Sequence, residues 1–199
     1  MKEYKNYIFD LGGVVVNIDM DRVYKGLHDL GIDNQSAEKL RIICDQYQLG
    51  QISSDAFCHE VCSLAKGNAT PEQVRDIWVS VDQGVDLGKL ETISRLHLDH
   101  NVFLLSNTNE LHWLQILNHD FIANGYKQDD LFHHVFLSQE MGLAKPGRVI
   151  FLRVLSEAGI SAEETLFIDD TKENIDAAKS CGIDAILVEK NSPWPKNLF

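Results

Sequence analysis

Five apolar runs in this chain have the composition of buried β-strands. Successive apolar residues, rather than alternating apolar and polar ones, are typical of strands covered on both faces of a parallel sheet. The runs are YIFDL from Tyr7, VFLLS from Val102, VFLS from Val135, TLFID from Thr165 and AILVE from Ala185. Helical segments separate them, and this alternation predicts an α/β protein whose core is a doubly wound, Rossmann-like parallel sheet.

Two amphipathic segments flank the fourth run and predict helices. Ile150 and Val154 belong to a stripe with i, i+4 spacing that ends at Gly159, a residue suited to a helix C-terminus. After the run, TKENIDAAKSCG begins with Thr171 as a candidate N-cap and ends at Gly182. A helix before and after a strand is the usual connection between parallel strands.

About ninety residues separate the first two runs, which is far more than a crossover helix needs. Within them, ATPEQVRDIWVSV offers Thr70 as N-cap, Pro71 at N1 and Gln73 at N3, the pattern of a capping box. SAEKLRIICDQY and SSDAFCHEVCSLAKG are also helical in pattern. We therefore predict a helical cap subdomain over residues 17–97, inserted into a core domain made of residues 1–16 and 98–199.

The overall charge narrows the choice of partner. The chain has 30 acidic and 18 basic residues, a formal net charge of -12, and no arginine- or lysine-rich tract. This balance argues against binding to nucleic acid or to an anionic membrane surface and favours a small ligand. No run approaches about 20 continuous apolar residues and the start MKEYKNYIF lacks signal-peptide features, so we expect a cytoplasmic protein. The sequence leaves the oligomeric state open.

Polar side chains gather where the predicted strands end. Ligands of open parallel sheets bind beyond the carboxyl ends of the strands, so these positions are candidates for a site. They are Asp10 after the first run, Ser106 and Asn107 after the second, Lys145 in the segment MGLAKPG after the third, and Asp169 and Asp170 after the fourth. Taken singly, each has an ordinary explanation as a helix cap or a surface residue, and their combination is what indicates a site.

The three carboxylates of this set require a counter-charge. Asp10, Asp169 and Asp170 carry three negative charges, and close carboxylates either take up a proton or bind a cation. A divalent ion and Lys145 together supply three positive charges, so the site without substrate becomes neutral. Hard carboxylate and carbonyl oxygens suit Mg²⁺, which commonly bridges to a substrate phosphate. The remaining polar groups would hold that phosphate, namely Ser106, Asn107 and Lys145.

Four segments, in this order, resemble the signature motifs of the haloacid dehalogenase-like hydrolase superfamily: FDLGGV, LLSNTN, LAKPG and LFIDDTKENIDAA. The resemblance implies a Mg²⁺-dependent phosphatase with a Rossmann-like core and a helical cap of the first type. It also implies that Asp10 is a nucleophile that forms an aspartyl-phosphate and that Lys145 keeps it in register with the phosphate. Ser106 would grip a phosphoryl oxygen. The implied metal ligands are Asp10, the backbone carbonyl of Gly12, Asp169 and Asp170.

Within the superfamily, FDLGGVVVNID with LSNTN looks most like the bacterial subgroup of sugar phosphatases that act on α-D-glucose 1-phosphate. One position departs from the superfamily pattern. Most of its phosphatases carry a second aspartate two residues after the nucleophile as general acid and base, and here that residue is Gly12. A general acid is worth about 10²–10⁴-fold in rate, so a substrate with a good leaving group, such as a hexose 1-phosphate, fits this site. Otherwise another group or a water supplies the proton, or turnover is slow.

Two other interpretations stay open. A hydrolytic 2-haloacid dehalogenase would use a similar aspartate without Mg²⁺, although the pair Asp169 and Asp170 would repel its carboxylate substrate. A non-catalytic phosphate-binding or signalling protein, like a response-regulator receiver, also gathers aspartates, a hydroxyl and a lysine around Mg²⁺. Receivers lack a long insertion after the first strand and carry their acidic pair early in the chain. In the preferred interpretation, the partner is a small phosphorylated metabolite.

Overall fold

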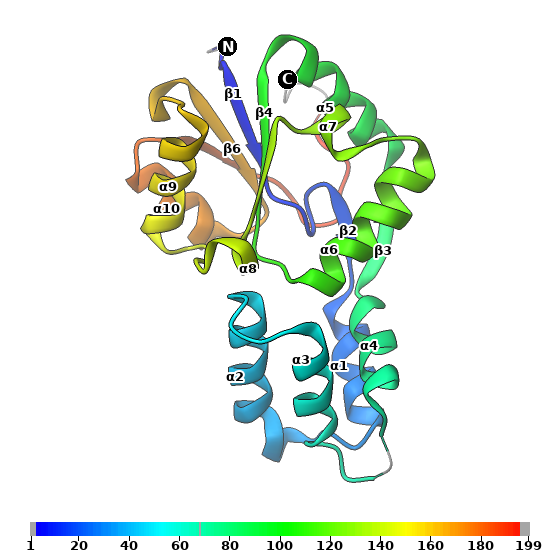
Figure 1. The fold of residues 1–199 in the computed structure, drawn as a ribbon. Helices are drawn as coiled ribbons and strands as arrows, with labels where there is room; N and C mark the ends of the chain where they lie inside the picture. Colours follow the sequence, from blue (N-terminus) through cyan, green and yellow to red (C-terminus); the bar gives the residue numbers. More distant parts are fainter. Residues whose placement is uncertain (1–2, 68, 196–199) are drawn as a thin grey trace.

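The computed structural model describes residues 3–67 and 69–195. Its centre is a sheet of five parallel strands in the order β5-β4-β1-β6-β7 (Figure 1). The strands are β1 (Asn6–Phe9), β4 (Asn101–Ser106), β5 (His134–Leu137), β6 (Thr165–Asp169) and β7 (Asp184–Leu187). They coincide with the five apolar runs, so the predicted doubly wound parallel sheet is confirmed.

Helices cover both faces of this sheet. On one face, α9 (Arg148–Ala158) and α10 (Lys172–Ser180) pack against a buried cluster that includes Ile8. On the other, α5 (Leu87–Asp99) packs against a second cluster that includes Phe9. Because neighbouring residues of β1 point to opposite faces and both faces are covered, the strand carries a continuous apolar run.

Short elements complete the core. They are α6 (Glu110–Ile116), the π-helical turn η2 (Leu117–Phe121), the 3-10 turns η3 (Ile122–Asn124) and η4 (Ala162–Glu164), α7 (Gln128–Leu131) and α8 (Ser138–Met141). None of the described helices combines the length and the apolar character that crossing a membrane requires.

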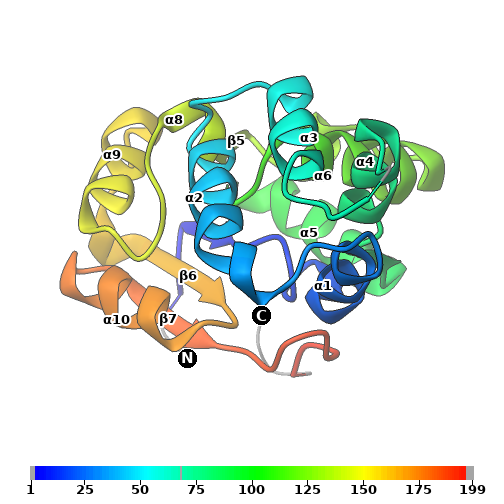
Figure 2. The same ribbon diagram turned by 90° about the horizontal axis from the view of Figure 1, so that it is seen from below.

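Four helices form a separate layer beyond the carboxyl ends of the strands (Figures 1 and 2). They are α1 (Met20–Asp29), α2 (Ala37–Gln48), α3 (Ser54–Cys62) and α4 (Pro71–Val79), with the 3-10 turn η1 (Asn34–Ser36) before α2. The helices share a third buried cluster, in which Phe57 packs against both Tyr47 and Trp78. The capping box predicted at Thr70 and Gln73 is present at the start of α4.

A short antiparallel ribbon joins this layer to the sheet. Its strands are β2 (Val16–Ile18) and β3 (Asp82–Val85), which are too short and too mixed in burial to be predicted from the sequence pattern. Helix α5, which the sequence analysis assigns to the cap, contributes Leu90 and Ile93 to a buried cluster of the sheet. The division into a cap of residues 17–97 and a core stays a prediction. Helix α5 falls mostly inside the predicted cap but packs against the sheet.

The carboxyl groups of Asp120 and Asp82 are neighbours, and Asp82 belongs to β3 of this ribbon. Asp120 lies in η2 and is 4% exposed, and its Oδ2 has no hydrogen-bond partner among the described residues. Burial and the neighbouring Asp82 of β3 raise the pKa of Asp120 to about 7. The folded chain therefore holds a proton on Asp120 that an unfolded chain releases at about pH 4.

We expect this carboxyl group to make the stability depend on pH. Because its pKa is raised in the folded state, its contribution is fully present below about pH 4 and is lost as the pH rises through about 7. Asp120→Asn keeps the shape of the side chain and does not ionise. Its free energy of unfolding, relative to that of the wild type, should rise by roughly 1–3 kcal/mol between about pH 5 and pH 8. Urea unfolding at a series of pH values measures this difference, and parallel stability curves would contradict the assignment.

Candidate functional site

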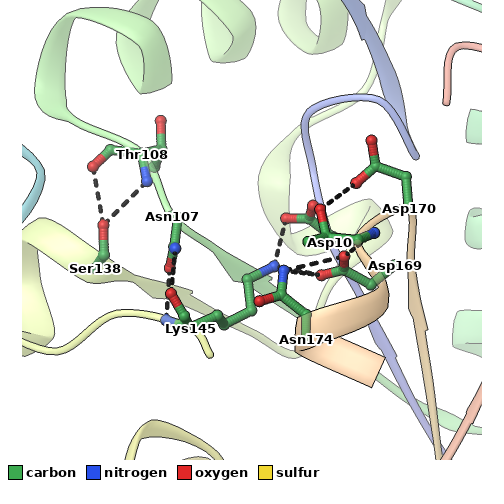
Figure 3. Close-up of polar contacts among 9 residues, drawn as sticks. Asp10, Asn107, Thr108, Ser138, Lys145, Asp169, Asp170 and Asn174 are labelled. Atoms are coloured by element: carbon green, nitrogen blue, oxygen red, sulfur yellow. Dashed lines mark hydrogen bonds and ion pairs between the residues drawn. The ribbon is translucent and has the colours of Figure 1, made fainter. Parts of the chain in front are cut away.

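Three aspartates meet at the carboxyl ends of two neighbouring strands (Figure 3). Asp10 follows β1, Asp169 ends β6, and Asp170 is the next residue in the chain. Because β1 pairs with β6 in parallel, with Phe9 beside Ile168, these strand ends lie side by side. One carboxylate oxygen from each aspartate lies within 4.8 Å of the other two. The structure thus brings the acidic residues of the predicted site together.

Lys145 lies buried between two of these carboxylates. Its Nζ is 2.7 Å from Oδ1 of Asp10 and 2.7 Å from Oδ2 of Asp169. Burial alone would lower the pKa of Lys145, but the two carboxylates outweigh burial and raise the pKa above its usual value. The ammonium group therefore stays charged and offsets part of the negative charge of the cluster.

The remaining charge of the cluster favours a cation. Burial raises the pKa of Asp10 to about 6, a shift that Lys145 opposes and Asp169 increases. With all groups ionised, three carboxylates and one ammonium leave a formal charge of two minus. A divalent cation among these oxygens would neutralise the cluster, as the sequence analysis expects.

Asp169 and Asp170 have different surroundings. Asp169 is fully buried and accepts hydrogen bonds from the backbone of Thr171, the side-chain amide of Asn174 and the buried lysine. Asp170 is half-buried, its Oδ1 accepts a hydrogen bond from the Thr171 hydroxyl, and burial followed by the charge of Asp169 raises its pKa. Asp170 and Asp10 therefore have more lone pairs available for a cation than Asp169 has. Asn174 was not predicted from the sequence, although its position in the first turn of α10, just after the acidic pair, indicates that its amide can reach a carboxylate.

Asn107 holds the backbone of Lys145. Its Nδ2 donates to the Lys145 carbonyl at 2.8 Å, and its Oδ1 accepts a hydrogen bond from the Lys145 N–H at 2.9 Å (Figure 3). Asn107 follows β4 and Lys145 follows α8, so this pair ties two loops of the site together. The predicted contact of Asn107 with a phosphate stays a prediction, while its contact with Lys145 is a role that the sequence analysis missed.

The turn after Asp10 wraps around Asp170. Gly13 has a φ of 86°, in the left-handed region that favours glycine, and a Cβ at this position would overlap Oδ2 of Asp170. Gly12 has no such φ, and a Cβ there would meet only the flexible end of the Ile18 side chain, at 3.0 Å. The second glycine, rather than the first, is therefore the one that the packing of the acidic cluster requires.

A cavity of about 560 Å³ adjoins the acidic cluster and reaches the helical layer. Gly12, Ser106 and Asn107 line its end beside the cluster, and Thr108 and Asn109 continue the wall. One face of α1 and one face of α2 supply much of the opposite wall, with Met20, Tyr24, Leu27 and His28 from α1 and Leu40, Arg41, Cys44, Asp45 and Gln48 from α2. Two of the three predicted phosphate-binding residues, Ser106 and Asn107, thus share one cavity with the helical layer, whereas Lys145 is not among the residues that line it.

A polar network in the wall of this cavity ties α4 to α6. Trp78 Nε1 donates to Oδ1 of Asn109 at 3.2 Å, and Nε2 of His112 lies 3.0 Å from the Trp78 carbonyl oxygen. The rings of Trp78 and His112 stack with their centroids 4.9 Å apart. Burial lowers the pKa of His112 to about 4, so the ring is neutral near pH 7 and donates through Nε2. No sequence pattern pairs these residues, because they lie more than 30 positions apart.

The fold and the site define a class of protein. A doubly wound parallel sheet carries an acidic cluster with a buried lysine at its carboxyl edge, and a helical layer covers that edge. Residues 4–182 match the family described as haloacid dehalogenase-like hydrolase. This chain belongs to that family of hydrolases, and the resemblance predicted from its motifs is confirmed.

Two proteins similar to this chain are phosphatases by name. D-ribitol-5-phosphate phosphatase of Bacteroides thetaiotaomicron is 30% identical over 198 residues, covering 98% of this chain and 96% of that protein. Sesquiterpene phosphatase astK of Aspergillus oryzae is 27% identical over 190 residues, covering 90% of this chain and 87% of that protein. A crystal structure of a HAD family enzyme from B. thetaiotaomicron, in complex with magnesium and inorganic phosphate, has a TM-score of 0.90 and 31% identity, covering 98% of this chain and 100% of that one. The predicted subgroup of α-D-glucose 1-phosphate phosphatases is not confirmed by these similarities.

We expect Gly13→Ala to weaken the binding of a divalent cation, because the new Cβ strains the left-handed turn and displaces Asp170. Gly125→Ala is the matched control, since Gly125 has a φ of 88° and a Cβ there would meet nothing within 4 Å, so it strains a left-handed turn without displacing Asp170. Isothermal titration calorimetry with Mg²⁺ should show a dissociation constant at least about tenfold higher for Gly13→Ala and changed by less than about threefold for Gly125→Ala. Equal effects of the two substitutions would contradict this account of the turn.

Proposed function

We propose that this protein is a Mg²⁺-dependent phosphatase that hydrolyses a small phosphomonoester through an aspartyl-phosphate on Asp10. The observation that carries the proposal is the cluster of Asp10, Asp169 and Asp170 with the buried ammonium of Lys145. A carboxylate held beside a lysine can attack a phosphoryl group, because the lysine stabilises the negative charge on the phosphoryl oxygens. The phosphatase names of two relatives, and the magnesium and phosphate of a related crystal structure, agree with this function.

The residues present fit a magnesium ion. Asp10 and Asp170 offer hard carboxylate oxygens close together, and Gly12, whose carbonyl is the further proposed ligand, lies two residues after Asp10 and lines the cavity. Asp169 completes the acidic side and, through its contact with Lys145, orients the ammonium. A bound Mg²⁺ would neutralise carboxylate charge and polarise the phosphoryl group.

In the proposed reaction, one carboxylate oxygen of Asp10 attacks phosphorus. The new bond forms as the bond to the leaving oxygen breaks, and that oxygen departs with the bonding electron pair. Lys145 and the hydroxyl of Ser106 hold the phosphoryl oxygens, while Asn107 keeps the Lys145 backbone in place. Water then attacks the phosphorus of the aspartyl-phosphate, which releases inorganic phosphate and restores the carboxylate.

The absence of a side chain at Gly12 bears on the leaving group. The anomeric oxygen of a sugar 1-phosphate leaves more readily than the oxygen of a primary alcohol, so it needs less help from an acid. The name of one relative contains a pentitol 5-phosphate, whose leaving group is a primary alcohol. The oxygen of that alcohol would take its proton from water or from a group of the cavity. We propose a sugar or polyol phosphate as the substrate, with a hexose 1-phosphate as the member that needs the least assistance.

The cavity walls support a hydroxyl-rich substrate. Asp45, Gln48 and Thr108 offer acceptors and donors for hydroxyl groups, and each lines the cavity that also contains Ser106. The alternative of a 2-haloacid dehalogenase fits less well, because the net negative cluster would repel a carboxylate substrate. A protein that only binds phosphate has no need of a nucleophile held against a lysine.

Phosphate release from a panel of hexose 1-phosphates, hexose 6-phosphates and pentitol 5-phosphates, with and without Mg²⁺, tests this function. We expect release that requires Mg²⁺ and that falls by at least about 10³-fold in Asp10→Asn, because the amide is not a nucleophile. Asp76→Asn, the same change at an exposed position of α4, is the control and should leave the rate unchanged. Unchanged turnover in a folded Asp10→Asn would contradict the mechanism, and no release from any substrate by the wild type would contradict the function.

A further inference from the structure

The segment after β7 lies against the loop that follows the proposed nucleophile. Residues 188–194 come after the part of the chain that matches the family, which ends at residue 182. The segment leaves the sheet at Val188, whose N–H donates to the Asp169 carbonyl at 3.0 Å. It then continues beyond β7, as its red trace in Figure 2 shows, and makes hydrogen bonds to the loop of residues 11–18. The segment therefore starts beside the strand that ends in Asp169 and ends against the loop that follows Asp10.

Asn191 is the main contact of this segment with the loop. Its backbone N–H donates to the Gly13 carbonyl at 2.8 Å. Its side-chain Oδ1 accepts a hydrogen bond from the Ile18 N–H at 2.9 Å, and its Nδ2 donates to the Ile18 carbonyl at 2.9 Å. The side-chain amide thus satisfies both polar groups of one backbone residue, as a neighbouring strand would.

The backbone of Asn191 is adapted to this contact. Its φ is 57°, and it is the one residue other than glycine with a positive φ within residues 3–67 and 69–195. Asparagine adopts this left-handed conformation more readily than most residues, but glycine adopts it more readily still. If the turn alone mattered, glycine would serve at least as well, so the amide contacts are what distinguish asparagine here.

A second contact anchors the same loop at Val14. Its carbonyl oxygen accepts hydrogen bonds from Nζ of Lys89 at 2.6 Å and from Nε1 of Trp194 at 3.2 Å. Lys89 is 4% exposed, and the Trp194 ring stacks on Phe9 with the centroids 5.2 Å apart. Since Phe9 precedes Asp10, the end of the segment contacts both the strand that carries Asp10 and the loop beyond it.

The anchored loop supplies three parts of the site. Gly12 and Gly13 form the turn around Asp170, and Ile18 lies against Gly12 and lines the cavity. Ile18 also ends β2, from which the chain enters α1 of the helical layer. Asn191 therefore contacts Ile18, a residue that lines the cavity and lies against Gly12 in the turn beside Asp170.

We propose that Asn191 is a positioning residue, and that residues 188–194 form a strap that holds the loop of residues 11–18 in the geometry the reaction needs. The inference rests on the proposed function, because the reaction in question is the one proposed for Asp10. The Asn191 side chain acts on Ile18 as Asn107 acts on Lys145: each side-chain amide makes two hydrogen bonds to the backbone of one residue. The strap places the turn at Gly12 and Gly13 through backbone contacts and does not itself touch the substrate.

Asn191→Gly and Asn191→Ala separate positioning from turn formation. Both remove the two side-chain hydrogen bonds, but only alanine strains the left-handed turn. Asn124→Gly is the matched control, because the Asn124 amide also donates to two backbone carbonyls, at 3.5 Å and 2.9 Å, within its own helical turns. The measurements are kcat, KM and the half-saturating Mg²⁺ concentration with the best substrate of the panel, the melting temperature, and amide hydrogen exchange of residues 12–18.

For Asn191→Gly we expect kcat/KM to fall at least about tenfold, with most of the loss in kcat, since small displacements of reacting groups are costly. The half-saturating Mg²⁺ concentration should rise, and the Ile18 amide should exchange faster, while the melting temperature stays within a few degrees of that of Asn124→Gly. Wild-type kcat/KM in Asn191→Gly together with a loss in Asn191→Ala would overturn the proposal, because the turn alone would then suffice.

Two further outcomes keep this proposal separate from the proposed function. If the wild type hydrolyses no substrate, the proposed function fails, and unchanged exchange of residues 12–18 in Asn191→Gly would then overturn the strap as well. If Asn191→Gly does not fold, Trp194→Phe decides, because it keeps a ring against Phe9 and removes the donor to the Val14 carbonyl. Wild-type kinetics and exchange in Trp194→Phe would overturn the strap, and a loss of kcat with faster exchange would support it.

Discussion

The crowding of three carboxylates, two of which pair with one buried lysine, is the constraint on which the site depends. Ionised groups taken out of water are costly unless paired, and here the pairing is built from the ends of neighbouring strands. Asn174 and the backbone of Thr171 saturate Asp169, and Asn107 holds the Lys145 backbone. The strand ends therefore position the carboxylates, while the side-chain amides of Asn174 and Asn107 hold Asp169 and the Lys145 backbone in place.

The same constraint explains the two glycines after Asp10. Gly13 gives Asp170 the room that any side chain would take, and its positive φ turns the chain back toward the ribbon of β2 and β3. Gly12 lies beside the cavity without being required by space, so its lack of an acidic side chain is a chemical feature of the site rather than a packing necessity. A phosphatase built this way depends on its leaving group more than one that carries an acid at this position.

Much of the sheet and of the acidic cluster could be predicted from the sequence, for physical reasons. Strands that are buried on both faces are apolar at successive positions. Because parallel strands end at the same edge of the sheet, the polar residues that follow them gather there, and Asp10 and Asp170 therefore lie together. The ribbon of β2 and β3 could not be predicted, because three or four residues carry no period. The amide contacts of Asn107 and Asn191 were missed because their partners lie 38 and 173 positions away, and only the folded chain brings them together. The sequence pattern could not assign α5 to the cap or to the sheet either, because its apolar spacing predicts a helix without indicating what that helix packs against.

The central claim is that Asp10 carries the phosphoryl group, and a trapped intermediate tests it most directly. The wild-type enzyme is mixed with substrate and Mg²⁺, quenched in acid within one turnover and reduced with borohydride, which converts a phosphorylated aspartate to homoserine. Peptide mass spectrometry then locates the converted residue. The account predicts homoserine at position 10, dependent on substrate. Conversion at another residue, or none while turnover proceeds under the same conditions, would contradict it.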